Sequence, residues 1–112
     1  RLARAGCLTA LQLDTVKSGR RAKACGIVTG RQKPQTAKGT LFVTLEDETG
    51  MVNAVVWRHV ADRQHRVLVD TQLMQIDGRL ERVDGVQHVI VQRMHCLDEL
   101  LQGLRSHSRD FH

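Results

Sequence analysis

The most restrictive feature of this sequence is an alternation of apolar and polar residues that is interrupted by two tight turns. In TLFVTLEDETGMVNAVVW (40–57), the turn DETG separates two alternating runs. A period of two places successive side chains on opposite faces of a strand. The pattern recurs at 73–82 and 86–94, around an Asp-Gly pair that favours a two-residue hairpin. The sequence therefore predicts antiparallel strands with one buried face.

Two further segments complete the order of elements. Residues 21–31 alternate as a strand in which Gly26 marks a bend or bulge, and 31–39 form a proline-containing loop. Residues 58–70 carry their apolar residues on one helical stripe. The predicted fold class is all-β with short helices. It is a five-stranded OB-fold Greek-key barrel, with a helix between strands 3 and 4 and flanking N- and C-terminal helices.

The flanking segments have helix signals of their own. Residues 8–19 offer Thr9 as N-cap and Gln12 as its capping-box partner, and 96–104 place leucines at helical spacing. Because the sequence starts at Arg1 without methionine, we expect a fragment of a longer protein. The predicted division is a helical appendage, a barrel, and a helix with a polar tail: 1–20, 21–95 and 96–112.

Composition restricts the class of protein. The length of 112 residues suits one domain. Three cysteines without a CxxC pair argue against a disulfide framework and a zinc ribbon, so we expect reduced thiols and a cytoplasmic location. No run approaches the roughly 18 apolar residues that a membrane helix needs, and we expect no membrane partner.

Charge is distributed unevenly along the chain. Residues 1–39 hold nine Lys or Arg against one acid, whereas residues 40–112 hold eight against eleven acids. A basic end on an otherwise balanced domain suits a polyanionic partner. A solvated basic surface without a partner is the alternative.

The residue types that carry catalysis or bind metals do not converge in this sequence. Glu46, Asp47 and Glu48 are adjacent, so on a strand they point to opposite faces and cannot hold one ion together. The six histidines lack the spacing of zinc ligands. Neither a serine nucleophile motif nor a glycine-rich phosphate loop is present. We predict no catalytic residue, no metal site and no cofactor in this part of the protein.

Nucleic acid binding is the better supported function. OB-folds bind oligonucleotides on strands 2 and 3, between the loop joining strands 1 and 2 and the loop joining strands 4 and 5. An outward aromatic side chain there can stack a base, which is worth about 1–3 kcal/mol. The candidate nucleic-acid-binding residues are Arg31, Lys33, Lys38, Phe42, Thr44, Asn53, Trp57 and Arg82.

The strand period assigns directions to these side chains. It turns Phe42 and Thr44 outward, and on the next strand it turns out the following residues: Met51, Asn53, Val55 and Trp57. Structural alternatives remain open. The basic loop or the N-terminal helix could cover Phe42, Trp57 could plug the end of the barrel, and the basic residues could be solvated.

GIVTGRQKPQTAKGTLFVTLEDETGMVNAVVW (26–57) resembles the C-terminal OB region of bacterial C-family DNA polymerases, the replicative alpha-subunit class. MVNAVVWRHVADRQHRVLVD (51–70) and the terminal SRDFH (108–112) resemble its error-prone, damage-inducible branch most closely. The resemblance covers about residues 8–112. The pattern F-x-x-L-x-D-x-x-G within it is shared with OB-folds of the anticodon-binding type.

The resemblance implies a parent DNA polymerase that copies damaged templates in a mutagenic translesion complex. Its implied partners are single-stranded template DNA, the polymerase body, a catalytically inactive Y-family-like polymerase homologue and a RecA-like accessory protein. The parent's catalytic aspartates would lie upstream of this chain. In anticodon-binding OB domains, the positions that Phe42 and Asn53 match face the bases.

A protein-docking module that anchors the polymerase in its complex, with little or no DNA binding, is the alternative function. Its motivation is the leucine stripe at 97–104 and the polar tail that follows. The candidate partner-binding residues are Ser108, Arg109, Asp110, Phe111 and His112.

Overall fold

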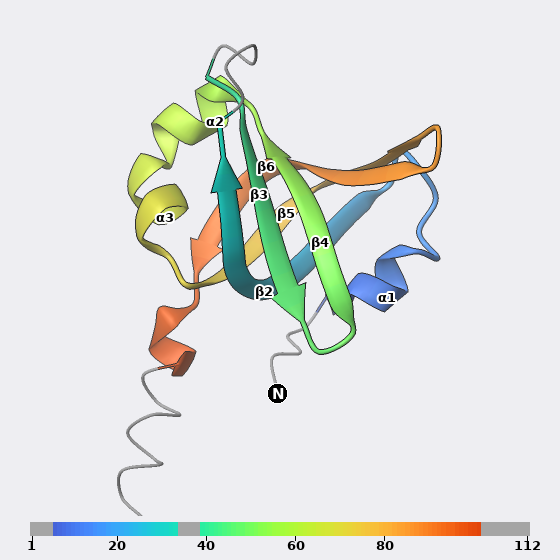
Figure 1. The fold of residues 1–112 in the computed structure, drawn as a ribbon, viewed down its shortest axis with the longest axis horizontal. Coiled ribbons are helices and arrows are strands. Elements are labelled where there is room, and N and C mark those ends of the chain that lie inside the picture. The colour runs from blue at the N-terminus through green and yellow to red at the C-terminus, as the bar shows by residue number, and fades with distance from the viewer. Residues whose placement is uncertain (1–5, 34–38, 102–112) are drawn as a thin grey trace, which may run out of the picture.

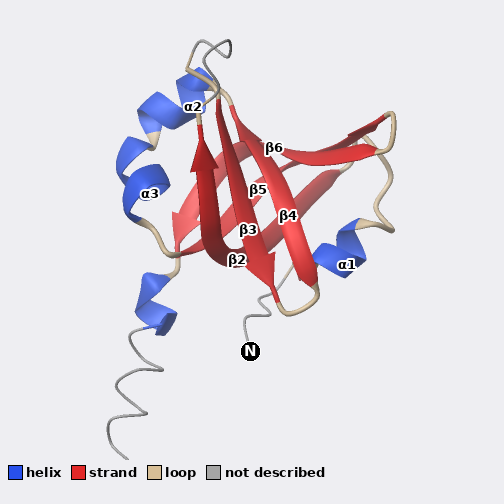
Figure 2. Cartoon of the chain, in the orientation of Figure 1, coloured by secondary structure: helices blue, strands red, loops and turns tan. Residues whose placement is uncertain are grey.

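The computed structural model describes residues 6–33 and 39–101. Its strands form one sheet in the order β1-β2-β3-β4-β6-β5, and an additional pairing of β2 with β5 closes the sheet into a barrel (Figures 1 and 2). The strands are β1 (Cys7–Leu8), β2 (Arg21–Gln32), β3 (Leu41–Asp47), β4 (Gly50–Val56), β5 (Leu73–Val83) and β6 (Val86–Cys96). The helices are α1 (Ala10–Leu13), α2 (Arg58–Arg63) and α3 (His65–Asp70). Strands β2 to β6 confirm the predicted five-stranded OB-fold barrel.

Strand β2 is long enough to serve both sides of the barrel. Its first half pairs with β5 as far as Ile27, and from Ile27 onward it pairs with β3. Gly26 lies at this change of partner, where a Cβ atom would stand 2.8 Å from the carbonyl oxygen of Glu46. Only glycine therefore allows β3 to approach this closely. Gly26 marks the bend of β2, while the bulge lies between Val28 and Gly30.

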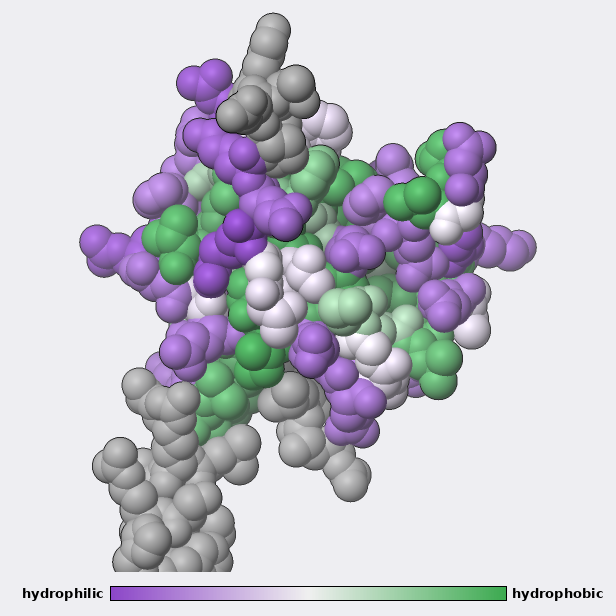
Figure 3. Space-filling model, viewed as in Figure 1, coloured by the Kyte–Doolittle hydropathy of each residue, from purple (hydrophilic) through white to green (hydrophobic). Residues whose placement is uncertain are grey.

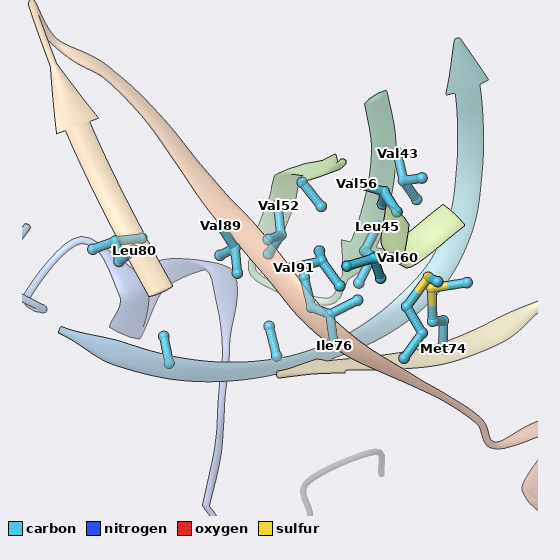
Figure 4. Close-up of a cluster of buried hydrophobic side chains, with 14 of the residues drawn as sticks. Val43, Leu45, Val52, Val56, Val60, Met74, Ile76, Leu80, Val89 and Val91 are labelled. Atoms are coloured by element: carbon cyan, nitrogen blue, oxygen red, sulfur yellow. The ribbon is translucent and has the colours of Figure 1, made fainter. Parts of the chain in front are cut away.

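The barrel interior is filled by the side chains that alternation turned inward (Figure 4). Val43 and Leu45 of β3 and Ile76 and Leu80 of β5 are all exposed by 1% or less. Each such burial is worth about 1.5–3 kcal/mol. Val60 of α2 joins the same cluster, so the helical segment is anchored by the core that it covers.

The segment predicted as one helix at 58–70 forms two. The break is Gln64, which has φ −118° and ψ 37°. Its side-chain Nε2 donates to the carbonyl of Met94 at 2.8 Å, and its Oε1 accepts from the Met94 N–H at 2.7 Å. This pair of hydrogen bonds ties the joint between α2 and α3 to the edge of β6.

The helix predicted at 8–19 is much shorter, and Leu8 belongs to β1, which pairs in parallel with β2. The capping box is confirmed, because Thr9 Oγ1 accepts from the Gln12 N–H at 3.1 Å and Gln12 Oε1 accepts from the Thr9 N–H at 2.9 Å. Helix α1 ends at Leu13, whose side chain is buried in the core and is 1% exposed. The chain then turns to β5, and the Gly19 N–H donates to a β5 carbonyl at 2.7 Å.

At the other end, residues 98–101 are helical. The carboxylate of Asp98 accepts from the Gln72 N–H at 3.0 Å and from the Leu73 N–H at 2.7 Å, which fastens this segment to the start of β5. The helix predicted at 96–104 starts later than expected, because Cys96 still belongs to β6 and Leu97 precedes the first helical residue. Residues 102–104 of that prediction lie outside the described residues. The three-part division of the chain stays a prediction. Within the described part, no helix has the length and apolar character needed to cross a membrane.

Candidate nucleic-acid interface

The outer face of β3 and β4 carries the side chains that alternation predicted there. Phe42 is paired with Val55, and Thr44 with Asn53, so the two pairs stand side by side across the strands. Phe42 is 40% exposed and Trp57, directly after β4, is 48% exposed. Neither aromatic ring is buried as a barrel plug. Figure 3 shows this face as pale and green residues over β3 and β4, with hydrophilic residues gathered on both sides.

One outward residue differs from its prediction. Val55 was expected to be exposed beside Phe42, but it is only 8% exposed. Its register explains this, because Val55 is flanked by Phe42 on β3 and by Ile90 on β6. The three side chains form an apolar row across the outside of the barrel. Ile90 was missed in the sequence, although the inward Val89 and Val91 on either side of it signal its outward direction.

A pocket of about 340 Å³ lies beside this row. Its walls come from the end of β4, from α2 and from the outer side of β6. The lining residues are Trp57, His59, Val60, Arg63, Ile90, Val91 and Gln92. Arg63 Nη2 donates to the Gln92 carbonyl at 2.9 Å, which holds α2 against β6. The volume is at the lower end of the roughly 300–1,000 Å³ typical of ligand pockets.

A second hollow, of about 390 Å³, opens between β4 and β6. These strands are paired only at Ala54 with Val89 and at Val55 with Ile90, and they separate towards the β5–β6 turn. Met51 and Asn53 form one side of the hollow, and residues 85–89 form the other. Asn53 therefore lies both on the predicted face and at the rim of a cleft that the sequence pattern did not indicate.

Arg31 has a structural partner at the end of α3. Its Nε donates to the Leu68 carbonyl at 2.6 Å and its Nη2 donates to the Thr71 carbonyl. A cation at the C-terminal carbonyls of a helix is favourable because it satisfies acceptors that the helix leaves open. Lys33 is exposed just after β2, and Lys38 lies outside the described residues.

Arg82 is also engaged by the fold. Its Nε donates to Gln87 Oε1 at 3.0 Å, and its Nη2 donates to the carbonyls of Leu13 at 3.3 Å and Asp14 at 3.4 Å. The guanidinium thus joins the β5–β6 hairpin to the end of α1. The candidate residues Ser108 to His112 lie outside the described part of the chain, and their role stays a prediction.

The acidic run at the β3–β4 turn is organised around Asp47. Its carboxylate accepts from the N–H groups of Thr49 at 2.7 Å, Gly50 at 3.1 Å and Ala10 at 2.8 Å. Partial burial raises the pKa of Asp47, but these hydrogen bonds and one from the Thr49 hydroxyl outweigh it, so the pKa lies below its ordinary value. Glu46 and Glu48 are exposed. Asp47 therefore stabilises the DETG turn that the sequence predicted.

The last candidate chemistry to consider is metal binding. Among residues 6–33 and 39–101, no group of three or more His, Cys, Asp or Glu side chains could hold an ion.

Known proteins resemble this chain in sequence and in fold. An error-prone DNA polymerase of Pseudomonas fluorescens (strain Pf0-1) is 53% identical over 106 residues, which cover 95% of this chain and 10% of that protein. An error-prone DNA polymerase of Bordetella parapertussis is 53% identical over 109 residues, which cover 93% of this chain and 10% of that protein. The chain therefore spans about a tenth of the length of these relatives, and the resemblance to the error-prone branch is confirmed.

In three dimensions the chain is similar to asparaginyl-tRNA synthetase from Pyrococcus horikoshii. The TM-score is 0.67 at 17% identity, and the match covers 81% of this chain and 23% of that one. This likeness bears on the fold alone. Residues 22–97 match the family described as OB-fold nucleic acid binding domain. Because that match spans more than half of the sequence, the chain belongs to the family of OB-fold nucleic acid binding domains.

Proposed function

We propose that this domain holds single-stranded template DNA on the outer face of β3 and β4. It would do so as the C-terminal accessory domain of an error-prone DNA polymerase that acts in damage tolerance and mutagenic translesion synthesis. The observation that carries the proposal is the pair of exposed aromatic rings, Phe42 and Trp57, beside the polar Asn53 on that face. The family of the chain supports it.

Each group on this face has a distinct role. Phe42 and Trp57 present ring faces on which bases stack without regard to sequence. The amide of Asn53 both donates and accepts, so it can bond a base edge, and the Thr44 hydroxyl can do the same beside it. Val55 and Ile90 supply an apolar surface beside Phe42, and Ile90 and Trp57 both line the pocket at α2.

In this proposal, phosphate contacts come from basic residues between β2 and β3. Lys33 is exposed just after β2, and Lys38 follows it in the sequence, outside the described residues. Arg31 and Arg82 contribute less in this proposal, because Nε and Nη2 of each are bonded to the protein. Each keeps donors on Nη1 for a phosphate.

The test compares Phe42→Ala and Trp57→Ala with the unchanged chain in fluorescence anisotropy titrations against labelled oligo-dT. Loss of one stacked base, worth about 1–3 kcal/mol, weakens binding by about 5-fold to 150-fold. Val69→Ala is the matched control, since Val69 is an apolar side chain on α3 that is 41% exposed, close to the exposure of Phe42. Equal affinities for all three variants, or no binding even at low salt, would reject the proposal.

Protein docking in the mutagenic complex is the second candidate. It is favoured by large apolar side chains that are exposed away from the aromatic pair, such as Leu11 at 64% and Val83 at 63%. Its proposed partners are the inactive Y-family-like polymerase homologue and the RecA-like accessory protein, with residues 108–112 as the contact. Deletion of residues 106–112 should weaken capture of these partners in a pull-down, and undiminished capture would reject the role of the tail.

A further inference from the structure

We propose that Cys7 and Cys25 form a peroxide-oxidisable thiol pair whose disulfide fastens β1 to β2. The two sulfur atoms lie 2.8 Å apart, although the residues are 18 positions apart in the sequence. This inference concerns a modification site and is independent of the proposed DNA-binding face.

The position of the pair comes from the packing outside the barrel. Ala24 of β2 points into the core and is 0% exposed, so the neighbouring Cys25 points to the outer side. There Cys25 is 5% exposed, because a small cluster with Leu73 and Leu97 covers it. Cys7 packs at the margin of that cluster and is half-buried. Cys7 is therefore the more exposed residue of the pair, and the Cys25 sulfur lies next to it in an apolar, largely buried environment.

The strand pairing allows the sulfurs to close the remaining gap. A disulfide bond is about 2.05 Å long, so the sulfurs must approach by about 0.75 Å. Strand β1 contacts β2 through only two register pairs, Cys7 with Lys23 and Leu8 with Ala24. A strand with so short a ladder can shift at small cost, whereas Cys25 lies within the long ladder that joins β2 to β5 from Arg21 to Ile27.

The chemistry is a two-electron oxidation by hydrogen peroxide. The Cys7 thiol releases its proton, its thiolate attacks one peroxide oxygen, and the O–O bond breaks. The departing hydroxide takes up that proton and leaves as water, and Cys7 sulfenic acid remains. The Cys25 sulfur then attacks the sulfenic sulfur, the S–O bond breaks, and a second water leaves as the S–S bond forms. Two thiols are oxidised by one peroxide, which is reduced to two waters. A dithiol reductant reverses the bond.

Cys96 provides an internal comparison. It is exposed at the end of β6, opposite Met74 in the ladder. If accessibility alone decided oxidation, Cys96 would react first. If proximity decides it, the product is a Cys7–Cys25 cross-link.

The experiment treats the full 112-residue chain with hydrogen peroxide and then alkylates the remaining thiols under denaturing conditions. The expected product has lost two hydrogens, carries one alkyl group at Cys96 and yields a cross-linked peptide containing Cys7 and Cys25. Cys7→Ser and Cys7→Ala must abolish the cross-link, while Cys96→Ser must leave it unchanged. Circular dichroism of each variant tests whether the fold is retained, and Cys7 is chosen because it is only half-buried.

A second measurement tests whether the disulfide stabilises the fold and fastens β1 to β2. The oxidised chain should unfold at a temperature higher by at least about 5 °C than the reduced chain, because the bond restricts the unfolded chain. Amide exchange at residues 7–9 should slow on oxidation and recover on reduction. Alkylation of both Cys7 and Cys25 after peroxide treatment, or a cross-link that involves Cys96, overturns the proposal.

Discussion

At the scale of single residues, Asp47 shows how one carboxylate organises several backbone donors. It accepts from Thr49 and Gly50 in its own turn and from Ala10 at the start of α1, 37 positions away. The turn could be predicted from DETG, because Asp is favoured where a side chain bonds the backbone two residues on. The contact with α1 could not, since nothing in the local sequence couples residue 10 to residue 47.

Asp47→Asn keeps the size of the side chain but replaces one acceptor oxygen by a donor NH₂ group. At least one backbone donor then loses its partner, which should lower the free energy of unfolding by about 1–3 kcal/mol. Urea denaturation at neutral pH measures this. Glu48→Gln is the control, since Glu48 is exposed in the same turn, and it should change stability by no more than about 0.5 kcal/mol. Equal stability of the two variants would contradict the role of Asp47.

The same residue predicts a pH dependence. Because the pKa of Asp47 in the folded chain lies below its ordinary value of 3.8, the unfolded chain binds its proton more readily. The stabilisation is present above pH 3.8 and is lost as the pH falls through the folded pKa. Urea denaturation between pH 6 and about pH 3 measures the free energy of unfolding of the unchanged chain and of Asp47→Asn. The difference between these two free energies should become smaller as the pH falls. A difference in free energy of unfolding that is constant over this range would contradict the lowered pKa of Asp47.

At the scale of elements, Gly78 allows β5 and β6 to approach each other where their register shifts. A Cβ atom at Gly78 would overlap the carbonyl oxygen of Ile90 and stand 2.8 Å from its carbonyl carbon. Both obstacles are backbone atoms and cannot rotate away. Alternation over 73–82 predicted this strand, but it could not indicate the close approach, because the register shift between Asp77 and Gly78 depends on the partner strand.

Gly78→Ala should therefore destabilise the barrel by about 3 kcal/mol or more, as overpacking against fixed backbone does. Gly30→Ala is the matched control, because its Cβ would meet only the Thr44 side chain, at 3.6 Å, which is ordinary contact. Thermal unfolding followed by circular dichroism compares the two. A Gly78→Ala chain as stable as Gly30→Ala would show that β6 can move aside.

Helices α2 and α3 depend on Gln64 as a joint. Gln64→Ala removes both hydrogen bonds to the Met94 backbone and should cost about 1–3 kcal/mol of unfolding free energy. Chemical denaturation measures the loss. Arg66→Ala, on an exposed position of α3, is the control and should stay within about 0.5 kcal/mol of the unchanged chain. The Gln64 variant should also increase amide exchange at Met94.

At the scale of the whole molecule, the predicted strands were confirmed because each depends on a period that is local to the chain. Long-range contacts account for what was missed. Leu13 enters the barrel and shortens the predicted first helix, and Ile90 covers Val55 from a strand that is distant in sequence. Arg31 and Arg82 carry charges suited to phosphate, yet backbone carbonyls on other elements occupy some of the donors of each guanidinium. Alternation can assign a side chain to a face, but it cannot identify its neighbours.

The uneven charge of the chain leads to a prediction that separates stacking from phosphate contact. Binding through Lys33 and Lys38 releases counterions, so log affinity should fall with log salt by about 0.7 for each phosphate neutralised on a single strand. Lys33→Glu with Lys38→Glu should reduce that slope by at least about 1.4, whereas Phe42→Ala should lower affinity at every salt concentration and leave the slope unchanged. Titrations with oligo-dT at four salt concentrations measure both quantities. A slope that changes with Phe42→Ala, or persists in the double Lys variant, would move the DNA contact away from the β3–β4 face.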